Sequence, residues 1–146
     1  MTILLVSPGQ RPKKVTIDDS LAAMQHTVGG PVQAVYPFEE PVALICHEEG
    51  KLLRLPLNRA LRSPDTGEIY DIIAGDFFLC TAPPDSAHFE SLTDDQLERY
   101  ARIFRTPEMF LSCLGGSIIV LSLPDVSFFS SDETALSKKE NPCPFL

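Results

Sequence analysis

The segment IYDIIAGDFFLC, residues 69–80, is one of the longest apolar stretches of the sequence. It consists of two short runs rich in β-branched and aromatic residues, over 69–73 and 76–80, on either side of Ala74-Gly75. Such residues favour strands, and a glycine between two apolar runs marks a turn, a bulge or a close approach of two backbones. We therefore expect two strands at the centre of a sheet.

Strand signals continue on both sides of this segment and are bounded by turn residues. Pro8-Gly9 joins the first two strands as a hairpin, and Glu48-Glu49-Gly50-Lys51 reverses the chain in the same way further on. Because the strands follow one another in hairpin order rather than alternating with long helices, they predict a mostly antiparallel sheet. The further strands that we expect cover residues 2–6, 14–17, 32–36, 42–46, 51–55 and 116–123.

Two longer segments carry helix signals. Ser20 is a candidate N-cap for a helix over residues 20–28, which Gly29-Gly30-Pro31 ends. Thr93-Asp94-Asp95-Gln96 matches a capping box, and the apolar residues that follow recur at helical spacing. We expect this second helix to cover residues 94–106.

These elements predict one domain of the α+β class. A chain of 146 residues, 44% of them apolar, is of the commonest size for a single core. We expect a mostly antiparallel, strongly bent sheet of about five to seven strands, either open or partly closed into a small barrel, with the two helices packed outside. Residues 107–129 are expected to pack on this domain as an extension. Residues 130–146 are polar, charged and interrupted by proline, which is typical of a flexible tail.

Composition and charge disfavour several classes of function. The formal net charge of −8 argues against direct binding to nucleic acid, because that affinity depends on Lys and Arg displacing counterions from phosphates. No apolar stretch has the length of a membrane-spanning helix. The first residues, MTILLVSPG, lack the basic start of a signal peptide. We therefore expect a cytoplasmic protein.

The cysteines and histidines show no metal or cofactor signature. The four cysteines are widely spaced, and we expect Cys46 and Cys80, which lie in apolar runs, to be small buried side chains. His26, His47 and His88 are dispersed and lack the paired spacing of metal-binding helices. We therefore expect neither a bound metal nor a cofactor.

The most suggestive polar cluster is Asn58 and Arg59, with Arg54 and Arg62 nearby. A proline at the first position predicts a single helical turn over residues 56–61. The exposed backbone N–H groups of such a turn, beside a guanidinium, could bind a small phosphorylated ligand.

A structural interpretation of the same cluster stays open. In it, Asn58 closes a turn and Arg59 pairs with a surface carboxylate, either Asp71 or Asp76. These two carboxylates could instead belong to the ligand site, or act as bases or metal ligands if they converge. A small enzyme that uses Asp71, Asp76 or Glu48 is therefore a further hypothesis.

A resemblance to known proteins is carried by five segments, residues 28–38, 41–52, 55–61, 70–78 and 92–96. Taken together, they resemble a family of small uncharacterised proteins carried by phages, plasmids and conjugative elements of anaerobic bacteria. The resemblance covers about residues 1–106, and it implies that this part is one conserved-type α+β domain. The family is a domain of unknown function, so the resemblance implies a genomic setting and no catalytic residue.

Three functions are compatible with these observations. The first is a non-enzymatic binding or regulatory accessory protein of a mobile element, which engages a host or element-encoded protein. The second is a domain that binds a small anion or nucleotide near Asn58 and Arg59 and removes a defence signal. The third is the small enzyme described above.

Overall fold

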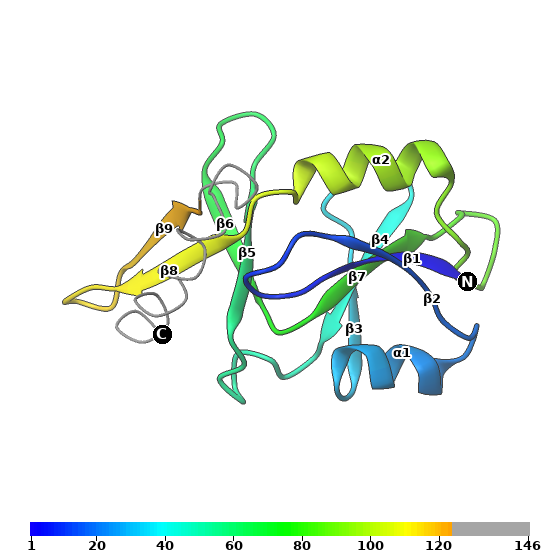
Figure 1. The fold of residues 1–146 in the computed structure, drawn as a ribbon, viewed down its shortest axis with the longest axis horizontal. Coiled ribbons are helices and arrows are strands. Elements are labelled where there is room, and N and C mark those ends of the chain that lie inside the picture. Colours follow the sequence, from blue (N-terminus) through cyan, green and yellow to red (C-terminus); the bar gives the residue numbers. More distant parts are fainter. Residues whose placement is uncertain (124–146) are drawn as a thin grey trace, which may run out of the picture.

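The structure, a computed structural model, describes residues 1–123 (Figure 1). Its two helices are α1 (Leu21–Val28) and α2 (Asp94–Ile103). The strands are β1 (Thr2–Val6), β2 (Lys13–Thr16), β3 (Val32–Val35), β4 (Val42–His47), β5 (Leu57–Arg62), β6 (Ile69–Ala74), β7 (Phe77–Thr81), β8 (Glu108–Ser112) and β9 (Ile118–Ser122).

The main sheet has five strands in the order β2-β1-β7-β4-β3, and every neighbouring pair is antiparallel. The α+β class and the mostly antiparallel sheet are thus confirmed. The sheet is open within the described part of the chain, because β2 and β3 are its two outer strands and do not pair with each other. The remaining strands form two hairpins, β5–β6 and β8–β9.

The sequence run 76–80 lies at the centre of the sheet as predicted, whereas 69–73 does not. β7 pairs with β1 on one side and with β4 on the other. β6 pairs with β5 alone, and this hairpin stands at one end of the sheet (Figure 1). Gly75, with φ 82°, provides the change of direction between β6 and β7.

One helix covers each face of the sheet, so the domain has three layers (Figure 1). Side chains alternate along β7, because successive residues of a strand point to opposite faces. Phe77 and Leu79 belong to the core beneath α2, and Phe78 and Cys80 belong to the core against α1. Both faces of the central strands are therefore buried, which explains their unbroken apolar sequence.

The helix boundaries follow from their caps. The Ser20 side chain accepts the N–H of Ala23, and Gly29 adopts a left-handed conformation with φ 86° after α1. Thr93 and Gln96 form the predicted capping box at the start of α2. The local signals thus predicted both helices and the start of α2, which ends at Ile103 rather than at the predicted residue 106.

Two local predictions are wrong. The predicted strand over 51–55 is a series of turns, in which the Leu55 N–H donates to the Gly50 carbonyl and Arg54 has φ 56°. The predicted helical turn over 56–61 is instead β5. Pairing with β6 buries the middle of this segment, and burial of a paired strand outweighs the weak local preference for a helical turn.

The chain beyond α2 continues into the β8–β9 hairpin, where β9 accounts for the strand signal at 116–123. The predicted tail over 130–146 lies outside the described residues. No helix within residues 1–123 is long and apolar enough to cross a membrane. Cys46 and Cys80 are buried and unpaired in disulfides, as expected, and burial raises the pKa of Cys80 to about 12.

Candidate functional site

The predicted anchor residues Asn58 and Arg59 are buried inside the fold. Asn58 is 0% exposed and Arg59 is 1% exposed. The Asn58 amide nitrogen donates to the carbonyls of Val6, at 2.9 Å, and Gly75, at 2.8 Å. Its amide oxygen accepts a hydrogen bond from Arg59 at 3.0 Å. Asn58 therefore joins β5 to the end of β1 and to the turn between β6 and β7.

Arg59 joins two further parts of the chain through backbone carbonyls. Its Nε and Nη2 atoms donate to the Phe104 carbonyl at 3.2 and 3.0 Å. Nη2 also donates to the Gln10 carbonyl at 2.6 Å, and Nη1 donates to the Asn58 carbonyl at 3.2 Å. Burial lowers the pKa of Arg59, and the negative charge of Glu108 opposes this shift. Because these N–H groups donate to carbonyls of the protein itself, Arg59 holds parts of the fold together.

The other predicted site residues occupy different places. Arg62 donates to the Glu108 carboxylate at 2.6 Å. Asp71 forms an ion pair with Lys51, and Asp76 is half-buried immediately before β7. Arg54 is exposed in the turns that precede β5. The structure therefore places Arg59, which Asn58 contacts, and Arg62 beside one groove, whereas Arg54, Asp71 and Asp76 do not line it.

That groove has a volume of about 670 Å³ and lies between α2, the loop after β3 and the β5–β6 hairpin. A concave site of this size is comparable to the pockets that hold small ligands or anchoring side chains of a partner. Its main apolar and aromatic residues are Pro37, Phe38, Tyr70, Tyr100, Ile103 and Phe104. Its charged residues are Glu39, Glu40, Arg59, Arg62, Arg99 and Glu108.

Aromatic rings form the floor of the groove. The Phe38 ring lies 4.6 Å from that of Tyr100 and 6.2 Å from that of Phe104, between ring centroids. Phe77 of the central strand contacts Phe104 edge-on at 5.4 Å. Such tilted and edge-to-face pairs are favourable beyond the area they bury. The floor is thus continuous with the core beneath α2.

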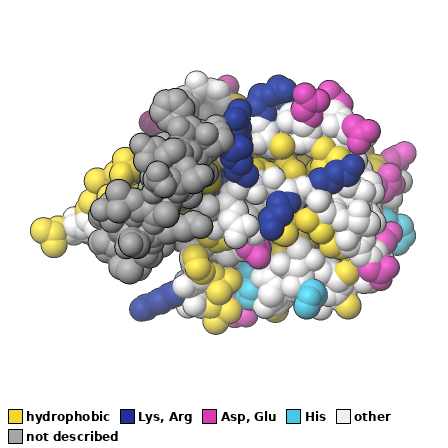
Figure 2. Space-filling view, viewed as in Figure 1, with side chains coloured by type: hydrophobic (Ala, Val, Ile, Leu, Met, Phe, Trp, Pro, Cys, Tyr) yellow, Lys and Arg dark blue, Asp and Glu magenta, His cyan; other side chains and the backbone are white. Residues whose placement is uncertain are grey.

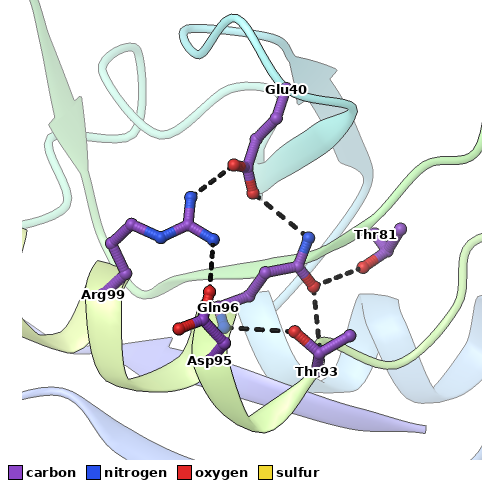
Figure 3. A network of polar contacts seen from close by, with 6 residues as sticks. All are labelled: Glu40, Thr81, Thr93, Asp95, Gln96 and Arg99. Atoms are coloured by element: carbon purple, nitrogen blue, oxygen red, sulfur yellow. Dashed lines mark hydrogen bonds and ion pairs between the residues drawn. The ribbon is translucent and has the colours of Figure 1, made fainter.

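A polar network builds one wall of the groove (Figure 3). Glu40, in the loop before β4, forms an ion pair with Arg99 and accepts a hydrogen bond from the Gln96 side chain at 3.1 Å. The Gln96 oxygen accepts from the N–H of Thr93 at 2.9 Å and from the Thr81 hydroxyl at 3.2 Å. The capping box therefore also ties α2 to β7 and to the loop.

This network changes the ionisation of its members. Arg99 holds the pKa of Glu40 below its usual value, and Glu40 in turn raises the pKa of Arg99. Burial, with the help of Glu40, raises the pKa of Tyr100 to about 12. The Arg99 guanidinium also lies 5.5 Å from the centroid of the Tyr100 ring. The charged groups of this wall thus satisfy one another.

The opposite end of the groove is held by Glu108, which is 7% exposed. One carboxylate oxygen accepts the N–H of Ala60 at 2.9 Å and the other accepts from Arg62. With Arg59, Arg62 and Arg99 set against Glu39, Glu40 and Glu108, the formal charge of the groove balances to zero.

A second, smaller hollow of about 150 Å³ lies beside the end of β4. Glu48 and Asp71 both line it, whereas Asp76 does not. The His47 ring is packed against Gly30, and its Nδ1 atom accepts the N–H of Glu49 at 2.9 Å. No three potential metal ligands are grouped among residues 1–123.

Sequence reasoning missed three groove residues, Glu40, Arg99 and Glu108. Arg99 had a partial signal, since Asp95 lies one helical turn before it and the two pair at 3.0 Å. Glu40 and Glu108 had no such signal, because their partners are far away in the sequence and only the fold brings them together.

These features define a small three-layer α+β domain with one apolar groove and an internally paired rim. The chain belongs to the family DUF3846, a domain of unknown function, whose sequence model matches residues 1–105. No curated protein and no solved structure matches the chain. The family match ends shortly after α2, so the β8–β9 hairpin lies beyond it.

The contacts of Arg59 predict a large loss of stability in Arg59→Met. The variant leaves the buried carbonyl of Phe104 without its donor and removes the bond to Gln10, so we expect the free energy of unfolding to fall by about 3–5 kcal/mol. Urea denaturation followed by circular dichroism measures it. Arg102→Met, at a side chain that is 70% exposed, is the matched control and should change stability by less than about 1 kcal/mol. Equal stability of the two variants would contradict a structural role for Arg59.

The pKa of Tyr100 predicts a loss of stability in alkali. The folded pKa is raised to about 12 from the ordinary value of 10.0, so the unfolded chain releases this proton first. Stability therefore falls as the pH rises from about 10 to 12. In Tyr100→Phe we expect a smaller fall, measured as the free energy of unfolding in urea at a series of pH values. Tyr36→Phe, at a residue 61% exposed, is the control; an unchanged pH dependence in Tyr100→Phe would refute the assignment.

Proposed function

We propose that this protein is a non-enzymatic binding module: a cytoplasmic accessory protein of a phage, plasmid or conjugative element that engages a host or element-encoded protein. The groove beneath α2 is the binding site in this proposal. The observation that carries it is a concave apolar surface, continuous with the aromatic core, beside which Arg62 pairs with Glu108 and Arg99 pairs with Glu40.

The exposed part of the groove supports binding of an apolar group. Ile103 is 59% exposed and Tyr70 is 58% exposed, on opposite sides of the groove. Exposed apolar patches with a polar rim are typical of protein interaction sites.

The rim indicates what kind of partner fits. Arg62 pairs with Glu108, and Arg99 pairs with Glu40 and Asp95. A strongly charged partner would have to compete with these internal pairs, whereas an apolar side chain gains its full burial energy. We therefore expect the partner to insert a leucine, methionine or aromatic side chain from a segment with little net charge.

The proposal predicts that Ile103→Gln weakens partner binding. Burial of one isoleucine side chain contributes about 1.5–3 kcal/mol, so we expect the dissociation constant to rise about tenfold to hundredfold. The partner is identified by affinity capture from host lysate and mass spectrometry. Its affinity is then measured with the purified partner by isothermal titration calorimetry.

Leu21→Gln is the matched control for this experiment. Leu21 is 57% exposed and lies on α1, on the other face of the sheet. This variant should bind the partner as the wild type does. A partner that binds Ile103→Gln with wild-type affinity is not held in the groove, and a wild type that captures no partner contradicts the binding function.

A small anion or nucleotide is the second candidate, favoured by the three arginines that line the groove. The side chains of Arg62 and Arg99 are each 42% exposed there, and the charge of Arg59 lies behind them. An anion could replace the carboxylate partners of the two exposed arginines.

This second candidate predicts that nucleotides stabilise the fold. A ligand present at about 100 times its dissociation constant adds about 2.7 kcal/mol, which thermal denaturation with a panel of mono-, di- and cyclic nucleotides detects. Arg62→Gln should lose the response, and Arg102→Gln, outside the groove, should keep it. The absence of any shift across the panel would remove this candidate.

A further inference from the structure

The β8–β9 hairpin differs in charge from the rest of the protein. Residues 109–123 contain no Asp, Glu, Lys or Arg, although 22% of the chain is charged. The hairpin projects from one end of the molecule (Figure 1), and its visible end in Figure 2 shows only hydrophobic and uncharged groups. Three large apolar side chains of its outer strand, β9, are exposed: Ile118 at 43%, Ile119 at 48% and Leu121 at 44%.

The backbone of β9 presents an unpaired edge within the described part of the chain. β9 pairs with β8 in a regular antiparallel register, and the N–H of Leu123 donates to the Pro107 carbonyl at 2.8 Å. Hydrogen-bonded and non-hydrogen-bonded pairs alternate along such a ladder. The residues whose N–H and C=O groups point away from β8 are therefore Ile118, Val120 and Ser122.

The other outer strands of the described sheets carry features that discourage pairing with another chain. β2 has only four residues and exposes Lys13 and Lys14. β3 is equally short and lies between Pro31 and Pro37. β6 carries Asp71, and its register with β5 is irregular. Lysine, proline, charge and bulges are the usual protections of a sheet edge, and β9 has none of them.

The sequence of β9 is complementary to itself. If two copies pair antiparallel about a two-fold axis at Val120, Ile119 of one copy lies opposite Leu121 of the other. Ile118 then lies opposite Ser122, and about six backbone hydrogen bonds form across the axis. No charged side chain meets its own copy in this register, which matters for a chain with a net charge of −8.

We propose that β9 pairs with β9 of a second copy of this chain, so that two β8–β9 hairpins form a four-stranded antiparallel sheet in a symmetric dimer. An isolated two-stranded hairpin is only marginally stable in water. The added strands satisfy the outward backbone groups and cover apolar side chains on the hairpin. This inference does not depend on the groove or on its partner.

The test is the molar mass of the full chain by sedimentation equilibrium over a range of micromolar concentrations. We expect the mass of a dimer that dissociates on dilution. Val120→Pro removes one outward N–H without removing a hydrogen bond to β8, so we expect its dimer dissociation constant to rise about tenfold or more. Val120→Ala keeps the N–H and should still form the dimer.

A second pair of variants keeps the test decisive if the proline disturbs the hairpin. Ile119→Lys places two like charges near the two-fold axis and should give a monomer. Leu114→Lys, at the fully exposed hairpin tip, adds the same charge away from the edge and should leave the dimer intact. A wild-type chain that is monomeric at every concentration overturns the proposal. A dimer that is as tight in Ile119→Lys as in the wild type also overturns it.

Discussion

The buried guanidinium of Arg59 is the interaction on which the arrangement of the layers depends. It joins β5 to the carbonyl of Phe104 at the end of α2 and to the carbonyl of Gln10 in the turn between β1 and β2. A buried cation is tolerated only when its donors are satisfied, and here backbone carbonyls satisfy them. The last carbonyls of a helix also carry partial negative charge. The position of the β5–β6 hairpin relative to α2 is therefore specified by one side chain, and Asn58 orients that side chain from the same strand.

The groove is a consequence of this arrangement. Arg59 holds the hairpin against the end of α2, and the two sides of the opening are then closed by separate polar contacts. On one side Glu40 bonds to Gln96 and Arg99, and on the other Glu108 bonds to Ala60 and Arg62. Since these charges are paired within the chain, they position the walls and add little attraction for a charged ligand. The apolar side chains between them are what the site offers to a partner.

Sequence signals were sufficient to predict those elements that depend on interactions between residues close together in the sequence. The capping box at Thr93 and the left-handed glycine after α1 involve neighbours a few residues apart, and the unbroken apolar run of β7 reflects burial on both faces. The sequence leaves two interpretations of Asn58 and Arg59 open, a ligand anchor on a helical turn or a turn closed by Asn58 with Arg59 paired to a surface carboxylate, and neither names their partners. Their partners outside β5 are main-chain carbonyls 17 to 52 residues away, and a carbonyl has no sequence signature. Two polar residues beside a proline look the same in sequence whether they bind a ligand or hold the fold together.

The family match covers the part of the molecule that contains the Arg59 network and leaves out the β8–β9 hairpin. Gln10, Asn58, Arg59 and Phe104 all lie within residues 1–105, so the matched part contains the whole of the Arg59 network. The β8–β9 hairpin lies beyond it and is attached to β5 through Glu108, whose carboxylate takes the place of a neighbouring strand at the Ala60 N–H. Glu108 also lines the groove. Glu108 therefore belongs to both parts of the molecule: it lies opposite Ser122 of β9 in the hairpin, and its carboxylate borders the groove through Ala60 and Arg62.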